Sequence, residues 1–326
     1  MAPQVSIIIP TKKINDYLRR ETIPNILDQN YRNFEIILLP DKKTKEKFSQ
    51  TKIIATYPRT GPADKRDLGA QKARGEILAF LDDDSYPVKN WLKQAVKIFQ
   101  ESQTIAGVAG PALTPPSNNL RQKASGYVWS TWLGSGGAGN YRCAVSQRKE
   151  VDDYPTVNLL VRKKDFLAVG GFDSHFWPGE DTKLCLDLTK KLRKKIIYHP
   201  QVLVYHHRRE VFGPHLKQIS RYAIHRGHFA RVLPETSFRP GYLLPSLFVL
   251  GLILGFFLSF LHPFFQLVYL GAIIFYLLLL FLTSLKVFLK EKNLPLALLL
   301  IPAILITHLV YGVLFIKGFF SPKLKR

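Results

Sequence analysis

The stretch Ile77–Asp84, ILAFLDDD, joins five apolar residues to three consecutive carboxylates. A short apolar run of this length is typical of a buried strand. Three adjacent carboxylates repel one another, and a divalent cation such as Mg²⁺ or Mn²⁺ would neutralise them. We therefore predict a strand that delivers Asp82, Asp83 and Asp84 to a metal site, with a solvated turn as the alternative.

Strands and helices alternate around this stretch. Three earlier apolar runs are predicted as buried strands: Val5–Pro10, Phe34–Pro40 and Lys52–Tyr57. Helices are predicted at 16–29, 62–73 and 89–100. This alternation is typical of a doubly wound, mostly parallel α/β sheet of the Rossmann-like kind.

Polar side chains follow three of these strands where each strand ends. Pro10-Thr11 closes the first, Asp41 follows the second, and the triple aspartate follows the strand that starts at Ile77. In a doubly wound sheet, ligands bind beyond the carboxyl ends of the strands. We therefore expect these residues to line one site.

The segment 113–150 is rich in Pro, Gly and Ser and carries the aromatic residues Tyr127, Trp129 and Trp132. We predict a long loop here, which either covers a ligand or is a partly ordered connection.

Beyond this segment, a strand at 157–163 precedes the sequence GGFD and the pair Glu180-Asp181. Leu184, Leu188 and Leu192 share one helix face, which places the acidic pair at the N-terminus of a buried helix. Acidic residues also stand there simply to match the helix dipole. The position after GGFD instead favours a general base.

Basic residues form two further candidate sites. Arg66 lies on the helix after Gly61 and either meets a phosphate or belongs to a solvated face. One or two edge strands at 196–205 lead into four basic residues that form either a cationic or metal-binding cluster or an exposed strand exit: His206, His207, Arg208 and Arg209.

A helix at 214–232 follows. It carries Gln218, Arg221 and Tyr222 at i, i+3 and i+4, on adjacent positions of its surface.

Three apolar runs of about 20 residues follow at 242–261, 264–285 and 294–316, each long enough to cross a bilayer as a helix. The loop Lys286–Asn293 carries three lysines, which predicts a cytosolic position. A third span would place the basic tail Lys317–Arg326 on the opposite side. Either that run turns back at Pro302 or the charge of the tail is tolerated.

The net charge of +22 comes without a nucleic-acid-binding motif, so we expect anionic lipid or an anionic substrate as the partner and no nucleic acid. The two cysteines fit a reducing compartment. The first residues lack the basic start and the apolar length of a signal peptide. We therefore expect the polar part to face the cytosol from a cell or inner membrane.

The order of the motifs is more specific than any one of them. Six motifs follow one another over residues 4–230: VSIIIPT, an aspartate after the second strand, Arg-x-x-Gly-x-x-x-Ala-x-Gly-Glu at 66–76, LDDD, GGFD with ED, and Q-x-x-R-Y. This set resembles the family 2 glycosyltransferases with their GT-A fold. The resemblance implies inverting transfer of a sugar from a nucleotide diphosphate donor, with a UDP-sugar favoured.

The resemblance also implies roles for the donor-side residues. The D-x-D motif would bind Mn²⁺ or Mg²⁺, with Asp84 as the direct ligand and Asp82 and Asp83 near the ribose and the sugar. Asp41 corresponds to the aspartate that contacts the base, and Pro10-Thr11 corresponds to the loop beneath it.

On the acceptor side, Asp181 of the E-D pair would deprotonate the acceptor hydroxyl. On the donor side, Gln218, Arg221 and Tyr222 correspond to the Q-x-x-R-W motif of processive members and are predicted to bind the donor. Tyr in place of Trp weakens an inference of polymer synthesis. Arg208 or Arg221 can offset the charge of the leaving diphosphate. Asp67 stands at a position where Asn is common in the family, so the resemblance does not fix the identity of the donor nucleotide.

We therefore predict a cytosolic GT-A catalytic domain at 1–235 and an all-α membrane anchor at 236–326. The expected acceptor is a hydroxyl of a lipid-linked or membrane-delivered glycan. Two alternatives stay open: a polyprenyl-phosphate sugar transferase, and a non-catalytic membrane scaffold that keeps the fold.

Overall fold

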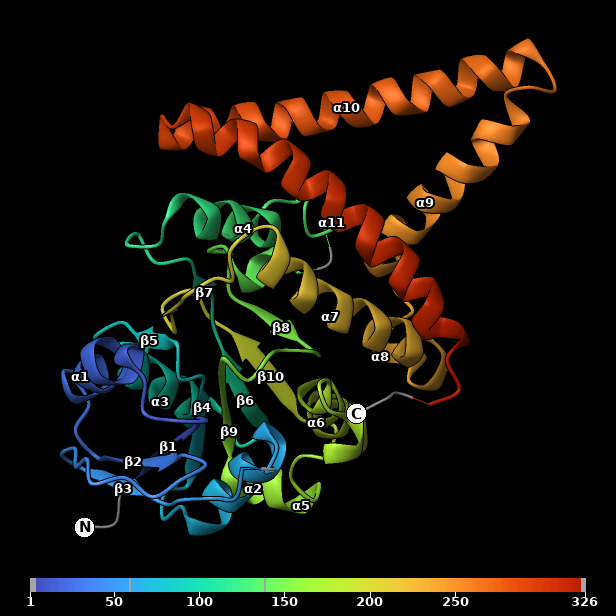
Figure 1. Ribbon diagram of the computed structural model, residues 1–326. Coiled ribbons are helices and arrows are strands. Elements are labelled where there is room, and N and C mark those ends of the chain that lie inside the picture. The colour runs from blue at the N-terminus through green and yellow to red at the C-terminus, as the bar shows by residue number, and fades with distance from the viewer. Residues whose placement is uncertain (1–3, 59, 138, 324–326) are drawn as a thin grey trace. The chain divides into compact units, whose positions relative to one another are not determined.

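The computed structural model describes residues 4–58, 60–137 and 139–323 (Figure 1). The chain packs as two compact units. Met1–Pro115 and Val145–His207 form the first, and Pro116–Ala144 and Arg208–Arg326 form the second. These units are defined by packing. The predicted catalytic domain at 1–235 concerns activity and stays a prediction.

The first unit is built on an eight-stranded sheet with the order β3-β2-β1-β4-β9-β6-β10-β8. Its strands are β1 (Val5–Pro10), β2 (Phe34–Leu39), β3 (Thr51–Ile53), β4 (Ile77–Leu81), β6 (Ile105–Ala109), β8 (Lys149–Val151), β9 (Asn158–Arg162) and β10 (Lys195–Tyr198). β1 pairs in parallel with β2 and β4, β2 with β3, and β10 with β6. β9 runs antiparallel between β4 and β6, and β8 runs antiparallel to β10. The doubly wound, mostly parallel sheet is confirmed. The expectation of edge strands at 196–205 is wrong, because β10 lies between β6 and β8, and the strand at 204–206 lies between two others in the small sheet described next.

A second sheet of three short strands has the order β5 (Ser85–Pro87), β11 (Val204–His206) and β7 (Ala112–Leu113). β5 starts directly after the triple aspartate. β11 runs antiparallel to it, with His206 opposite Ser85. This register carries a histidine from late in the chain to the end of β4.

Helices of the first unit cover the large sheet. They are η1 (Leu18–Thr22), α1 (Ile23–Leu27), α2 (Pro62–Lys72), α3 (Trp91–Glu101), α5 (Lys163–Ala168), η3 (Ser174–Phe176), α6 (Glu180–Leu186) and η4 (Asp187–Lys191). α3 buries its apolar face, including Trp91 and Phe99, in the core formed with β1, β2 and β4. The indole of Trp91 donates to the buried Asn158 side chain at 2.9 Å, and that side chain also donates to the carbonyl of Gly110 at 2.6 Å. These bonds satisfy polar groups that burial would otherwise penalise.

The second unit is helical. It contains α4 (Leu120–Ser130), η2 (Asn140–Arg142), α7 (Gly213–Val232), α8 (Pro234–Ser237), α9 (Pro240–Leu258), α10 (Pro263–Glu291) and α11 (Leu294–Phe320). The prediction of a long loop at 113–150 is wrong at α4. There the Asn119 side chain accepts from Gln122 N–H and the Gln122 side chain accepts from Asn119 N–H. This capping box starts a helix despite the Pro- and Gly-rich sequence around it.

The helices α9, α10 and α11 are each long and apolar enough to cross a membrane, which matches the three predicted runs. α11 continues through Pro302 as one helix of 27 residues, so the chain does not turn back at that proline. The three helices indicate membrane association.

Close packing within the second unit depends on glycine. A Cβ atom at Gly227 of α7 would lie 2.0 Å from the carbonyl oxygen of Phe315 on α11, whereas a Cβ atom at Gly251 of α9 would meet open space. We expect Gly227→Ala to destabilise the full chain by about 1–3 kcal/mol, the usual cost of overpacking. Gly251→Ala is the matched control, because alanine is the better helix former. Thermal unfolding in detergent measures both variants, and equal melting temperatures would contradict the packing described.

Candidate active site

The ends of β1 and β4 are joined by side chains. Thr11, which follows β1, is buried, and its hydroxyl donates to the Asp83 carboxylate at 2.5 Å. The parallel pairing of β1 with β4 brings these residues together from positions 72 apart in the sequence. Pro10, Thr11 and the triple aspartate therefore meet at the carboxyl edge of the sheet, where we expected the site.

Lys65 of α2 ties Asp41 to the same edge. Its ammonium group donates to the Thr11 carbonyl at 2.5 Å and forms an ion pair with the Asp41 carboxylate. Lys65 and Arg66 are only 3% and 5% exposed. The alternative of a solvated face on this helix is therefore wrong.

Arg66 connects the two acidic motifs of the sequence. One terminal nitrogen of its guanidinium lies 2.8 Å from Asp82, and the other lies 3.1 Å from Glu180. Its Nε is buried and has no hydrogen-bond partner among the residues that the structure describes. The guanidinium also lies over the Phe172 ring, 5.9 Å from the centroid. A charge buried this far needs such partners to be tolerated.

The acidic pair opens α6, and its two members have different surroundings. Glu180 is buried, and burial followed by the charge of Asp181 raises the pKa of its carboxyl to about 7, although Arg66 acts in the opposite direction. Asp181 is half-buried, and its Oδ1 accepts from the Thr182 N–H at 2.8 Å. The buried member thus positions the Arg66 guanidinium.

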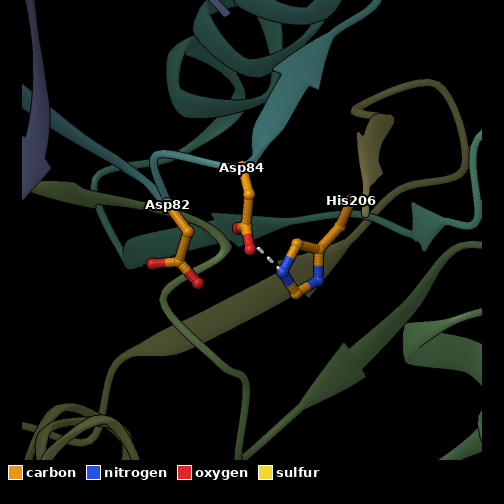
Figure 2. Close-up of side chains that lie close together, drawn as sticks. All are labelled: Asp82, Asp84 and His206. Carbon is orange, nitrogen blue, oxygen red and sulfur yellow. Dashed lines mark ion pairs between the residues drawn. The ribbon is translucent and has the colours of Figure 1, made fainter. Parts of the chain in front are cut away.

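Asp82, Asp84 and His206 form a compact group. One ligand atom from each lies within 4.8 Å of the others, and His206 Nε2 is 3.1 Å from an oxygen of Asp84. Figure 2 shows Asp82 and Asp84 on the turn after β4, with His206 facing Asp84 from β11. Two carboxylates and one imidazole are a donor set that divalent cations accept.

His207, which the sequence grouped with His206 as a metal ligand, does not join this cluster in the described residues. Its Nε2 lies 2.7 Å from Glu21, and its ring stacks on Tyr17 with centroids 4.2 Å apart. Successive side chains of a strand point to opposite faces, so neighbours at the end of β11 diverge. His207 still contributes through its backbone, since its N–H donates to the Asp84 carbonyl at 3.0 Å.

The other predicted residues belong to the second unit. The backbone N–H of Arg208 donates to Asn118 at 3.1 Å. Gln218 is half-buried on α7, and Arg221 is exposed. The Tyr222 ring meets Trp129 of α4 edge to face at 5.8 Å. Their roles in donor binding stay predictions.

Lys65 and Glu21 were not among the predicted site residues. Lys65 has a partial signal, because it lies next to Arg66 just after the Gly61-Pro62 helix start. Glu21 has no signal, since its contact with His207 joins residues 186 positions apart.

Asp67 carries a titration that can be tested. Burial raises the pKa of its carboxyl to about 6, although the carboxylate accepts from the Phe172 N–H at 2.9 Å. The stability that Asp67 contributes is therefore fully present below its unfolded pKa of 3.8 and is lost as the pH rises through about 6.

We expect Asp67→Asn, whose amide oxygen can keep the bond to Phe172, to raise the melting temperature of the full chain at pH 7.5 by roughly 2–4 °C. This gain should shrink as the pH approaches 4. Melting curves from pH 4 to 7.5 measure the effect, and a gain that does not change with pH would contradict the raised pKa.

Comparison with known proteins agrees with this geometry. Residues 6–167 match the family model described as Glycosyl transferase family 2. An uncharacterized glycosyltransferase of Haemophilus influenzae is 29% identical over 113 residues, which cover 32% of this chain and 45% of that protein. The matched segment thus spans less than half of that relative. A glucosyl-dolichyl phosphate glucuronosyltransferase of Haloferax volcanii is 20% identical over 223 residues, covering 62% of this chain and 69% of that protein.

A solved structure shares the fold over nearly the whole chain. It is the mannosyltransferase PcManGT from Pyrobaculum calidifontis in complex with GDP-Man and Mn²⁺, with a TM-score of 0.53 and 18% identity. The match covers 96% of this chain and 88% of that chain. The fold is that of the GT-A glycosyltransferases. The chain carries a glycosyltransferase family 2 domain, and the resemblance seen in the sequence is confirmed.

Proposed function

We propose that this chain is a membrane-anchored inverting glycosyltransferase. It moves a sugar from a nucleotide diphosphate donor, with a UDP-sugar favoured, to a hydroxyl of a lipid-linked or membrane-delivered glycan. The observation that carries the proposal is the Arg66 guanidinium, which contacts Asp82 at 2.8 Å and Glu180 at 3.1 Å. Through Arg66, Asp82 of the proposed metal site is held next to the Glu180-Asp181 pair, which contains the proposed general base.

The donor side is formed by the strand ends. Asp41, oriented by Lys65, is available for the nucleotide base, and Thr11 holds Asp83 close to it. The Pyrobaculum complex contains GDP-Man, whereas the family resemblance of this chain favours a UDP-sugar.

Asp82, Asp84 and His206 fit a divalent cation. Two carboxylate oxygens and an imidazole nitrogen within 4.8 Å of one another suit Mn²⁺, since carboxylates favour hard ions and imidazole is a common ligand of transition metals. The Pyrobaculum structure contains Mn²⁺. When bound, the cation would stabilise the charge of the leaving diphosphate.

The acceptor side depends on Asp181. As the acceptor oxygen forms a bond to the anomeric carbon, the bond from that carbon to the phosphate oxygen breaks, and the hydroxyl proton passes to the Asp181 carboxylate. The nucleoside diphosphate leaves with the bonding electrons. Attack from the face opposite the leaving group inverts the anomeric configuration. Glu180 keeps its ion pair with Arg66 and holds the guanidinium in place.

The membrane-associated helices and a relative both favour a lipid-linked acceptor. α9, α10 and α11 are suited to a bilayer, and the Haloferax relative is named for glucosyl-dolichyl phosphate, a lipid-linked sugar. Lys286, Lys290 and Lys292 at the C-terminal end of α10 favour a cytosolic site. We propose that the catalytic residues face the cytosol and meet an acceptor whose lipid lies in the same membrane.

The test uses the purified full chain in lipid nanodiscs with UDP-, GDP- and dTDP-sugars, Mn²⁺ and a polyprenyl-linked sugar. Release of nucleoside diphosphate that requires this acceptor, with an inverted anomer by NMR, is the expected result. Transfer with retention, or turnover that a chelator does not affect, would contradict the proposal.

A further inference from the structure

The helix α11 differs from α9 and α10 in what surrounds it. Ten of its residues are buried, whereas three residues are buried in each of the other two helices. Within the second unit, α11 runs beside α7, and α9 and α10 meet at an end away from α7 (Figure 1). The three helices are similarly apolar, and α10 and α11 are also similar in length, so the difference in burial comes from the elements that pack against them.

The C-terminal half of α11 pairs with α7 in a parallel register. The His215 ring of α7 lies 3.0 Å from the Thr307 hydroxyl. Further along, Gly227 packs on the carbonyl of Phe315, and Arg231 donates to the Ser321 carbonyl at 2.5 Å. The contacts thus continue from one end of α7 to the other.

The N-terminal half of α11 packs on α4. Leu296, Leu300 and Ile304 share an apolar cluster with Ala124 and Val128 of α4. In addition, His308 Nε2 lies 3.0 Å from the carbonyl of Leu133, just after α4. The whole length of α11 is therefore accompanied by α4 or α7.

The accompanying helix α7 is too polar to cross a bilayer. Its 20 residues include Lys217, Arg221, Arg226 and Arg231, and all of these except the half-buried Arg226 are exposed. If the paired half of α11 crossed the hydrocarbon, the exposed cations of α7 would enter it as well, and charged groups are strongly disfavoured there. The two helices must therefore lie at the same shallow depth.

We propose that α11 is an interfacial helix that lies along one leaflet together with α4 and α7. Its exposed apolar edge, which includes Leu294, Leu298, Val313 and Phe320, enters the acyl chains of that leaflet. The cations of α7 meet anionic headgroups. The chain then crosses the membrane only as the α9–α10 hairpin.

This arrangement removes the conflict between a third membrane span and the positive charge of the C-terminal tail. With two crossings, Lys286, Lys290 and Lys292 at the C-terminal end of α10 and the basic tail after α11 lie on the same side as α7, as the positive-inside rule requires. α7 follows β11 with no membrane-crossing helix between them among the described residues, so this side is also the side of the first unit.

Cysteine labelling in sealed membranes tests the proposal. The full chain carries Cys143→Ser, and the remaining Cys185 is fully buried. Single cysteines then replace Lys323 in the tail, Lys93 on α3 or Leu261 in the turn between α9 and α10, and an impermeant maleimide is added to one face at a time.

We expect Lys323→Cys to be labelled from the same face as Lys93→Cys. It should not be labelled from the opposite face, where Leu261→Cys reacts. Labelling of the tail from the Leu261 face would overturn the proposal. If Lys323→Cys is silent on both faces, an epitope tag at the C-terminus is digested with protease from either face. Loss of the tag from the Lys93 face supports two crossings, and loss from the Leu261 face refutes them. The result does not depend on the proposed sugar transfer.

Discussion

Replacing Asp84 with alanine is expected to abolish metal-dependent binding of the nucleotide-sugar donor. Asp84 is 6% exposed, lies 3.1 Å from His206, and supplies one of the three ligand atoms of the cluster. Removing a residue that only supports a metal ligand typically costs 10–100-fold in affinity, so loss of a ligand itself should exceed about 100-fold. Equilibrium binding of the donor to the full chain, with Mn²⁺ and with chelator, measures the effect.

Asp16→Ala is the matched control, because Asp16 is an exposed aspartate whose partner is the surface residue Arg19. It should bind the donor as the wild type does. If Asp84→Ala binds the donor with unchanged affinity in both conditions, the metal site lies elsewhere.

Asp181→Asn is expected to leave donor affinity nearly intact and to slow transfer by about 10²-fold or more, the usual contribution of a positioned general base. Asparagine keeps the size of the side chain, and its amide oxygen can still accept from the Thr182 N–H. It cannot take a proton from the acceptor hydroxyl. Single-turnover transfer and donor binding, measured on the same preparation, separate the two effects.

Glu180→Gln distinguishes the two acidic residues. Because Glu180 contacts Arg66, which in turn contacts Asp82, its loss should weaken donor binding as well as transfer. A near wild-type transfer rate in Asp181→Asn, together with a large loss of rate and unchanged donor affinity in Glu180→Gln, would assign the base to Glu180.

The sequence predicted the core of the fold because its strongest signals are local. The strand Ile77–Leu81 and the carboxylates that follow it lie where the apolar run ends, and the helices α2 and α7 begin within one residue of the predicted positions. Strand direction was not predictable in this way. β9 is buried on both faces, and its apolar run is the same whether it pairs in parallel or antiparallel.

Much of the site depends on contacts between distant residues. Arg66 and Glu180 are 114 positions apart, and only the fold shows that this arginine is buried between two carboxylates. Which of the two histidines lies in the site also depends on the register of the strands. The pairing of β11 with β5 decides that His206, and not His207, faces Asp84.

The error at α4 has a different origin. Prolines, glycines and serines at 113–150 suggested a loop, while the reciprocal bonds of Asn119 and Gln122 outweigh that composition and start an 11-residue helix. A capping box is visible in sequence when it is looked for. The partners that bury α4, which come from α10 and α11, are not visible there.

We propose above all that Asp82, Asp84 and His206 hold a cation for a nucleotide-sugar donor. The most direct test is equilibrium binding of a panel of nucleotide sugars to the full chain in lipid nanodiscs, with Mn²⁺, with Mg²⁺ and with chelator. We predict that at least one nucleotide sugar binds with a divalent cation and that chelator removes this binding. Equal binding of every nucleotide sugar with and without the cation would contradict the claim.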